Sequence, residues 1–371
     1  MVGDVLAGRA SVVPVPADDP AQAALLTRAL RAGEPIDDTV AVVLSTSGTT
    51  GTPKGAMLTA SALLASAEAT HQRLGGPGRW LLALPAYHVA GFQVLARSVV
   101  AGTEPVALAP SFTPADLVAA IAALGGGRRY ASLVAAQLDK ALRHAAAAAA
   151  LAELDAVLIG GGPIPAGVAE KAAAASIPVV RTYGMSETAG GCVYDGVPLR
   201  GVGVRIGGDG RIALGGPTVA LGYRNPVRPD PFAEPGWFQT DDIGALDDSG
   251  VLRVLGRADD AISTGGLTVL PNLVEAALAT HPAVAECAVF GVADERLGQR
   301  VVAAVVVADG ASLTLADARA HLVDRLPATA APRQLHIVEA LPHKGIGKLN
   351  RRELVRRFGS AHPEPGGRDR G

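Results

Sequence analysis

The segment Ser45–Gly55, STSGTTGTPKG, contains the residue types that bind phosphate groups. Glycines let the backbone approach a phosphate closely, hydroxyls and amides donate hydrogen bonds to its oxygens, and Lys54 adds a compact positive charge. The segment is not a Walker loop, because Pro53 stands where that motif requires a glycine. A flexible Ser/Thr/Gly linker is the alternative. The residues predicted to hold phosphate are Ser45, Thr46, Ser47, Gly48, Thr49, Thr50, Gly51 and Lys54.

Five further segments combine glycines with carboxylates or cations and are spread along the rest of the chain. They are Ile159–Pro165 (IGGGPIP), Tyr183–Thr188 (YGMSET), Gly236–Gly244 (GWFQTDDIG), Gly256–Gly266 (GRADDAISTGG) and Leu341–Arg351 (LPHKGIGKLNR). Taken singly, several have plain alternatives. The segment Ile159–Pro165 also has the composition of an ordinary strand-to-helix turn. Glu187 by itself is compatible with a solvent-exposed carboxylate, and the charged residues after Gly256 are compatible with a surface linker.

The elements that must position these segments alternate between strands and helices in the first half of the chain. The apolar runs predicted to be strands are Ala41–Leu44, Leu81–Leu84, Val157–Ile159 and Val179–Arg181. A helix is expected over about 61–74, and the alanine run Ala145–Ala150 is interpreted as a helix that continues from Lys140. Such alternation predicts an α/β domain with a largely parallel sheet.

The sequence pattern changes after Gly201 and again after Arg257. Turn residues between apolar runs predict β-hairpins over Arg205–Leu214 and Ala245–Leu255, which together form a β-rich subdomain. A small α+β domain follows, with helices at Asn272–Ala279 and Thr314–Leu326 and strands at Val284–Val289, Val301–Val307 and Gln334–Val338. The expected division is residues 1–256, a hinge at 257–260, a mobile C-terminal domain at 261–358 and a frayed tail at 359–371.

Composition excludes several classes of protein. The chain has 371 residues, of which 49% are hydrophobic and 18% charged, with a net charge of −2. This balance gives no basic footprint for nucleic acid, and no apolar run is long enough to predict a membrane span or a secretory signal. The two cysteines, Cys192 and Cys287, lack metal-ligand spacing. We therefore expect a cytoplasmic protein without a protein-only metal cage.

The six segments together resemble the signatures of the adenylate-forming superfamily, which includes acyl-CoA and aryl-CoA ligases, luciferases and peptide-synthetase adenylation domains. The similarity spans about residues 41–352, with the motifs in the family's order. It implies that Tyr183 stacks on adenine, that Glu187 helps to hold Mg²⁺, and that Asp242 binds the ribose hydroxyls. One departure is Asp241, which stands where the family usually has glycine.

The resemblance also assigns roles to residues near the end of the chain and around the nucleotide. Lys348 is the catalytic lysine that contacts the carboxylate and the α-phosphate, whereas Lys344 is expected to be a surface charge. Arg257 contacts ribose or phosphate, and Asp259 is the pivot of the hinge. The segment with Ser263, Gly265 and Gly266 lines the tunnel for CoA. Further residues implied in ATP binding are Gly161, Gly162, Gly184 and Thr188.

The sequence says less about the acid substrate than about the nucleotide. His88, in Pro85–Phe92, matches a position that gates the acid pocket, although a core histidine is an alternative. Peptide-synthetase domains place an aspartate just after this segment, and its absence here argues against an amino-acid substrate. About 45 residues precede the phosphate loop, a short form that resembles the actinobacterial o-succinylbenzoate–CoA ligases of menaquinone biosynthesis. The implied pocket residues are His88, Ser132, Gly161 and Thr188.

This resemblance implies a two-step reaction with ATP, Mg²⁺ and CoA. An aromatic dicarboxylate is first converted to an acyl-adenylate, and the CoA thiol then displaces AMP. The group that binds the second carboxylate stays open among Ser132, Arg181 and Thr188. The alternatives are another aryl- or acyl-CoA ligase and, from a different class, a degenerate nucleotide-binding protein without activity. The sequence does not decide the oligomeric state, for which a homodimer is one option.

Overall fold

The computed structural model describes residues 1–46, 53–344 and 348–359, and the chain divides into two compact units, Met1–Val254 and Leu255–Gly371. Three sets of predicted features lie outside the described residues. They are the middle of the phosphate loop (Ser47, Gly48, Thr49, Thr50 and Gly51), the side chain of Lys348 and the expected tail beyond Gly359. Within the described residues, no helix is long and apolar enough to cross a bilayer.

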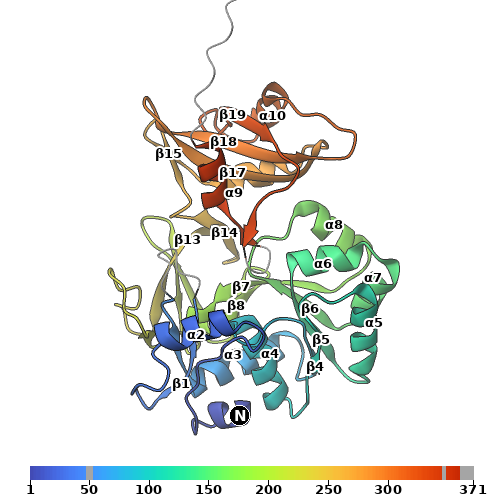
Figure 1. Ribbon diagram of the computed structural model, residues 1–371, viewed down its shortest axis with the longest axis vertical. Coiled ribbons are helices and arrows are strands. Elements are labelled where there is room, and N and C mark those ends of the chain that lie inside the picture. The colour runs from blue at the N-terminus through green and yellow to red at the C-terminus, as the bar shows by residue number, and fades with distance from the viewer. Residues whose placement is uncertain (47–52, 345–347, 360–371) are drawn as a thin grey trace, which may run out of the picture. The chain divides into compact units, whose positions relative to one another are not determined.

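A seven-stranded sheet in the order β4-β3-β5-β6-β7-β8-β9 forms the centre of the larger unit (Figure 1). The strands are β3 (Arg79–Leu82), β4 (Val106–Ala107), β5 (Arg129–Val134), β6 (Ala156–Gly160), β7 (Val179–Met185), β8 (Gly190–Tyr194) and β9 (Val197–Pro198). The first five run parallel, and β8 and β9 are antiparallel additions at one edge. The predicted, largely parallel sheet is thus confirmed.

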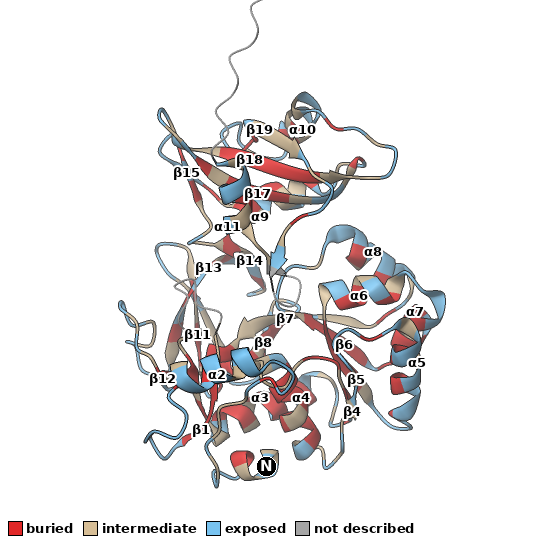
Figure 2. Ribbon diagram, viewed as in Figure 1, coloured by how far each residue is buried: buried red, intermediate tan, exposed pale blue. Residues whose placement is uncertain are grey.

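Helices cover both faces of this sheet, which explains its nearly continuous apolar strands. They are α3 (Ala60–Arg73), α4 (Val89–Val100), α5 (Pro114–Ala123), α6 (Ala135–Leu142), α7 (Ala145–Ala152) and α8 (Ala166–Ala174). Leu133 and Ile159 face the core shared with α5 to α8, whereas Trp80, Tyr130 and Leu158 face the opposite core. Figure 2 shows that the central strands β5 and β6 are buried along most of their length.

The alanine-rich region differs from the prediction, because it forms two helices and not one. α6 ends at Leu142, and α7 begins at Ala145 after His144, whose φ of −132° is extended. Ala147 and Leu151 of α7 are fully buried in the core that also contains Leu117 and Ile121 of α5. The break at Arg143–His144 therefore lets α7 take its own direction against α5, and the alanines themselves stay helical, as their propensity predicts.

Two antiparallel sheets complete the larger unit. One contains β1 (Val40–Leu44), β2 (Ala56–Thr59) and β12 (Gly222–Tyr223), and the other contains β10 (Gly203–Ile206), β11 (Arg211–Gly215), β13 (Trp237–Leu246) and β14 (Leu252–Arg257). The register Gly203↔Gly215 and the adjacency of β13 and β14 confirm both predicted hairpins. Two short N-terminal helices, α1 (Val2–Leu6) and α2 (Pro20–Ala29), precede β1.

The smaller unit is an α+β fold, as predicted. Its strands are β15 (Ile262–Thr264), β16 (Leu267–Val269), β17 (Val284–Asp294), β18 (Gly298–Val307), β19 (Gln334–Ile337), β20 (His343–Lys344) and β21 (Lys348–Leu349), and its helices are α9 (Pro271–Leu278), α10 (Leu315–Leu322) and α11 (Arg351–Phe358). Odd residues of β18, such as Val301 and Ala303, face α9 and α10, whereas Val302 and Ala304 face α11. β17 is longer than predicted, and α10 ends four residues earlier than expected.

Candidate nucleotide and acid site

Asp242 and Tyr183 form a buried hydrogen-bonded pair at the meeting of β13 and β7. The Tyr183 hydroxyl donates to Asp242 Oδ2 at 2.6 Å, and Thr240 Oγ1 accepts from the Asp242 backbone N–H at 3.0 Å. Burial, followed by the charge of Asp242, raises the pKa of Tyr183, so its phenol stays protonated as a donor at neutral pH. A carboxylate fixed in this way accepts hydrogen bonds, which is what the hydroxyls of a ribose require.

The neighbouring Asp241 occupies a different environment. Its side chain is half exposed and accepts from Arg211 Nη1 at 3.0 Å, whereas Asp242 is buried. Alternation along a strand turns adjacent side chains to opposite faces, so only one of the two aspartates can point toward Tyr183. The departure at Asp241 therefore leaves the candidate ribose-binding carboxylate in place.

Replacing Asp242 with asparagine is expected to raise the KM for ATP by roughly ten- to hundredfold, because hydrogen bonds to a charged group contribute about 1.5–3 kcal/mol. The measurement is the initial rate of pyrophosphate release over an ATP titration. Asp241→Asn is the matched control and should leave this KM unchanged, since Asp241 lies at the surface. Equal effects of the two substitutions would contradict the assignment.

Glu187 brings the second motif next to the start of the phosphate loop. Its carboxylate is only 7% exposed and accepts from the Tyr223 hydroxyl at 2.7 Å. Lys54 Nζ lies 5.1 Å from the centroid of the same Tyr223 ring, and Ser186 Oγ donates to the Ser45 carbonyl at 3.4 Å. β12 pairs with β2 directly after the loop, so two segments far apart in sequence meet here.

These residues fit a phosphate-bound Mg²⁺. Mg²⁺ in nucleotide sites is commonly held by one or two carboxylates together with phosphate oxygens and water. Glu187 supplies one such carboxylate, and the described part of the chain contains no group of three or more metal-ligating side chains. Thr46 Oγ1 is buried and has no partner within the described residues, which leaves it able to donate to a phosphate.

Glycines of the two motifs have different structural roles: Gly184 packs where a side chain would not fit, whereas Gly161 has a positive φ and Gly162 lies in open space. A Cβ on Gly184 would overlap the Gly190 carbonyl oxygen and lie 2.7 Å from the Gly191 Cα. Gly161 has a φ of +82°, and the exposed Gly162 has nothing within 4 Å of its Cβ position. Thr188 is fully buried, and its hydroxyl bonds to the Gly190 carbonyl at 2.9 Å, so it holds the turn together.

His88 begins α4 as its N-cap residue. Its ring lies 4.4 Å from the ring of Tyr87, and burial lowers its pKa, so the imidazole is neutral at physiological pH. A Cβ on Gly91 would overlap the Pro85 carbonyl oxygen, which shows how tightly the first turn of α4 packs on the preceding segment. His88 is thus a partly buried, uncharged side chain at the start of α4.

The inward face of α4 carries two polar residues that the sequence analysis missed, Gln93 and Arg97. Arg97 is 3% exposed, with Nη1 at 3.5 Å from Ser132 Oγ and Nη2 at 3.4 Å from the Tyr194 hydroxyl. Its guanidinium lies 4.8 Å from the Trp80 ring, and its Nε has no partner within the described residues. No described carboxylate pairs with it. The sequence signal that could have identified these two residues is their spacing of four positions in an otherwise apolar helix.

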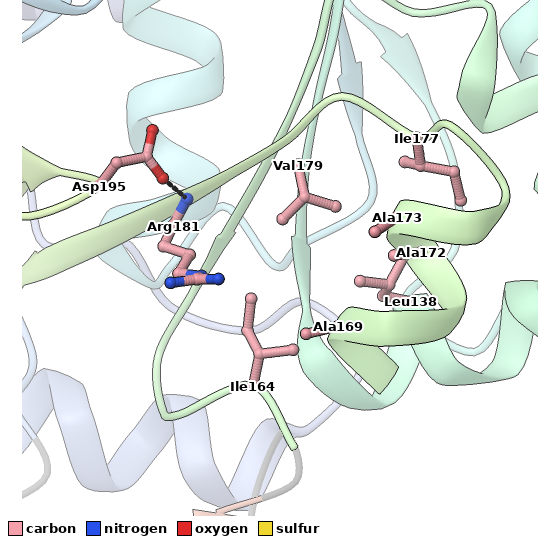
Figure 3. Close-up of a pocket in the computed structure, with 9 residues that line it drawn as sticks. All are labelled: Leu138, Ile164, Ala169, Ala172, Ala173, Ile177, Val179, Arg181 and Asp195. Carbon is pink, nitrogen blue, oxygen red and sulfur yellow. Dashed lines mark hydrogen bonds between the residues drawn. The ribbon is translucent and has the colours of Figure 1, made fainter. Parts of the chain in front are cut away.

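Arg181 lies in a different place, a groove of about 300 Å³ (Figure 3). Figure 3 shows its side chain among Ile164, Val179 and Leu138, while Asp195 accepts from its backbone N–H at 2.9 Å. None of the described motif residues other than Ile164, at the end of the glycine turn, lines this groove. Arg181 and Ser132 are therefore not brought together, whereas Arg97 and Ser132 are.

In the smaller unit, Arg257 and Asp259 form a bidentate ion pair. The distances are 2.7 Å from Nε to Oδ1 and 2.9 Å from Nη2 to Oδ2. Gly265 and Gly266, with φ values of +58° and +79°, form the two-residue turn of the β15–β16 hairpin, and Ser263 donates its backbone N–H to Gln299 Oε1 at 2.8 Å. The hairpin thus presents a turn without side chains.

Arg351 anchors the segment that follows Lys348. Its guanidinium contacts Glu275 at 2.7 Å, Asn272 Oδ1 at 2.9 Å and Asp260 at 3.1 Å. Burial raises the pKa of Glu275, and the positive charge of Arg351 opposes this rise. Lys348 itself lies in β21, which pairs with β20 through Lys344↔Lys348.

Comparison with known families accounts for both units. A model of the AMP-binding enzyme family matches residues 7–224, and a model of the AMP-binding enzyme C-terminal domain matches residues 273–348. Among solved structures, the o-succinylbenzoate CoA synthetase (MenE) from Bacillus subtilis in complex with the acyl-adenylate intermediate OSB-AMP is similar at 30% identity and a TM-score of 0.73. That match covers 85% of this chain and 69% of the other. The same protein has been solved with ATP and a magnesium ion.

Two relatives carry the same functional name. A protein of Mycobacterium tuberculosis named "Probable 2-succinylbenzoate–CoA ligase" is 65% identical over 95% of this chain and 97% of its own length. A 2-succinylbenzoate–CoA ligase of Geobacillus kaustophilus is 38% identical over 85% of this chain and 69% of its own length. The chain therefore belongs to the AMP-binding enzyme family, which is the adenylate-forming superfamily, and within it to the group of 2-succinylbenzoate–CoA ligases.

Proposed function

We propose that this protein is an AMP-forming acid–thiol ligase of menaquinone biosynthesis. It converts 2-succinylbenzoate, ATP and CoA to 2-succinylbenzoyl-CoA, AMP and pyrophosphate through an acyl-adenylate. The observation that carries this proposal is the 65% identity to a protein of that name over nearly the whole of both chains. CoA and ATP are both metabolites of the cytoplasm, where we place the reaction.

The first half-reaction joins two anions, so its barrier is largely electrostatic. The substrate carboxylate attacks the α-phosphate of ATP and expels pyrophosphate. Asp242 holds the ribose, the segment from Ser45 to Lys54 holds the phosphates, and Lys348 offsets the charge where acid and phosphate meet. Mg²⁺, when bound beside Glu187, adds further positive charge at the phosphates.

The second carboxylate of 2-succinylbenzoate requires its own donors, and Arg97 with Ser132 supplies them best. A buried guanidinium without an anionic partner is costly, and a carboxylate is the partner that its fork-shaped donor set fits. Of the three candidates from the sequence, Thr188 uses its hydroxyl inside its own turn, and Arg181 lies in the separate groove. Ser132 Oγ, 3.5 Å from Arg97 Nη1, is the remaining one.

The second half-reaction needs a different arrangement of the C-terminal unit. The CoA thiol attacks the activated carbonyl, and AMP leaves. We place the pivot at Asp259 within residues 257–260, and CoA beside Ser263, Gly265 and Gly266, where the turn leaves the backbone accessible. The Arg257–Asp259 ion pair lies within this hinge, so its release accompanies the movement that frees Arg257 for the nucleotide.

Replacing Asp259 with proline is expected to separate the two half-reactions. Proline fixes φ near −65° and restricts a residue that must adopt two backbone conformations. The rate of adenylate formation, measured as pyrophosphate release, should stay close to that of the wild type, whereas the rate of thioester formation should fall. Asp259→Ala is the control, because it removes the same ion pair and leaves the backbone free. An equal loss of both steps in the proline variant would assign Asp259 to folding or binding.

The proposed function is tested with purified protein, ATP, Mg²⁺, CoA and a panel of acids, with thioesters identified by mass spectrometry. We expect 2-succinylbenzoyl-CoA as the preferred product. Simple benzoates or fatty acids as the preferred substrates would make the chain another aryl- or acyl-CoA ligase. Binding of ATP without turnover of any acid would indicate a degenerate nucleotide-binding protein. Sedimentation of the same sample tests whether the protein is a homodimer.

A further inference from the structure

Gln93 is a fully buried glutamine whose amide has no hydrogen-bond partner among the residues that the structure describes. Its side chain is 0% exposed, and neither Oε1 nor Nε2 bonds to any described residue. Buried amides in native proteins are nearly always bonded, because an unsatisfied one carries a large desolvation penalty. Gln137, a second buried glutamine of the same unit, follows that rule, since its Nε2 donates to the Ala83 and Pro110 carbonyls at 2.9 and 3.0 Å.

Gln93 lies beside Arg97, the residue proposed to bind the second carboxylate of the acid. Gln93 lies one helical turn before Arg97, so both side chains leave the same face of α4. Within the described part of the chain Arg97 Nε also has no partner, and Arg97 Nη1 lies 3.5 Å from Ser132 Oγ. Across from Gln93, Gly190 has a φ of +95°, and a Cβ built there would lie 3.3 Å from Gln93 Cγ. A residue with a side chain at position 190 would therefore crowd the glutamine.

Three polar groups on the elements packed around α4 already make hydrogen bonds to other residues. The Gly190 carbonyl accepts from Thr188 Oγ1 at 2.9 Å, and the Ala189 carbonyl accepts from Ser66 Oγ at 2.9 Å. The Tyr194 hydroxyl is shared between Thr70 at 2.9 Å and Arg97 at 3.4 Å. Arg97 Nε, which also lacks a partner among the described residues, is a donor for Gln93 Oε1, and a bound molecule can supply the acceptor for Gln93 Nε2.

We propose that Gln93 is a specificity-determining residue that recognises the polar arm of the acid, the part that is not activated. When the acid is bound, Gln93 Nε2 donates to an oxygen of this keto-acid arm, and Gln93 Oε1 accepts from Arg97 Nε. Gln93 thus adds a neutral donor beside the cation and fixes the guanidinium for the arm's carboxylate. The inference rests on the proposed function, and it predicts discrimination against acids of the same size with an apolar arm.

The test compares 2-succinylbenzoate with 2-butylbenzoate, an acid with an apolar ortho arm, in the wild type and in Gln93→Leu. We expect the ratio of kcat/KM for the two acids to fall by roughly tenfold to a hundredfold in the variant, because a hydrogen bond to a charged group is lost. Gln93→Glu should reduce this ratio further, since a carboxylate one helical turn from Arg97 competes with the substrate carboxylate for the guanidinium.

Thermal unfolding without ligand separates recognition from a structural role. Leucine removes an unsatisfied amide, so Gln93→Leu should keep or raise the Tm. Gln137→Leu is the matched control: it breaks three hydrogen bonds and should lower the Tm without changing the acid ratio. A Gln93→Leu protein with lowered Tm and an unchanged acid ratio would overturn the inference and leave the proposed function standing. A wild type that does not activate 2-succinylbenzoate would overturn both.

Discussion

Replacing Lys348 with alanine is expected to slow acyl-adenylate formation by roughly 10²–10³, the usual cost of about 3–4 kcal/mol for losing one preorganised donor. Its ammonium is the cation that the family motif assigns to the junction of acid and α-phosphate. Lys348→Arg should also be poor, because a larger planar cation does not occupy the same point position. The measurement is pyrophosphate release from ATP and 2-succinylbenzoate.

The second half-reaction provides the control for Lys348. Starting from presynthesised 2-succinylbenzoyl-adenylate and CoA, Lys348→Ala should form thioester at nearly the wild-type rate, since the lysine acts only in the first step. Lys344→Ala, on the paired strand β20, should leave both half-reactions unchanged. A Lys348→Ala protein that releases pyrophosphate at the wild-type rate would refute the electrostatic mechanism proposed above.

Arg97→Ala is expected to lower kcat/KM for 2-succinylbenzoate by about thirtyfold to several thousandfold, because removing one partner of a buried charge pair costs about 2–5 kcal/mol. The effect should lie mainly in KM for the acid, while KM for ATP stays unchanged. Arg97→Lys keeps the charge but loses the bidentate geometry, so its activity should fall between wild type and alanine.

Two controls make the Arg97 result specific. Arg181→Ala removes the arginine that lies in the separate groove, and it should leave kcat/KM for the dicarboxylate unchanged. Activity of Arg97→Ala toward 2-butylbenzoate should fall much less than activity toward 2-succinylbenzoate, because that acid has no second carboxylate. Equal losses for both acids would indicate a structural role for Arg97, beneath Trp80 and Tyr194, and would leave the second carboxylate without an assigned partner.

Many of the strands, hairpins and motifs could be predicted from the sequence because they depend on residues that are close together in the chain. Apolar runs bounded by turn residues predicted three of the five parallel strands (β3, β6 and β7) and both hairpins, since strand formation and turn chemistry depend on neighbouring residues. The motifs likewise identified the family, because residues such as Tyr183, Glu187 and Asp242 stand at fixed positions within short segments. The helix at Ala145–Ala150 was predicted correctly, but its continuity with the segment at Lys140 was not, because the chain breaks at Arg143–His144 and α7 packs against α5 as a separate helix.

What only the tertiary structure decided is which residues from distant segments meet. The hydrogen bonds from Tyr183 to Asp242 and from Tyr223 to Glu187 join residues 59 and 36 positions apart. Arg97 and Gln93 looked like single polar residues in an apolar helix, and their chemistry emerges only from the burial of α4 beside Ser132 and Gly190. The physical reason is that a donor is unsatisfied only when the residues packed around it in the folded protein offer it no acceptor. The sequence determines which donors exist, and the packed fold determines which of them are left for a ligand.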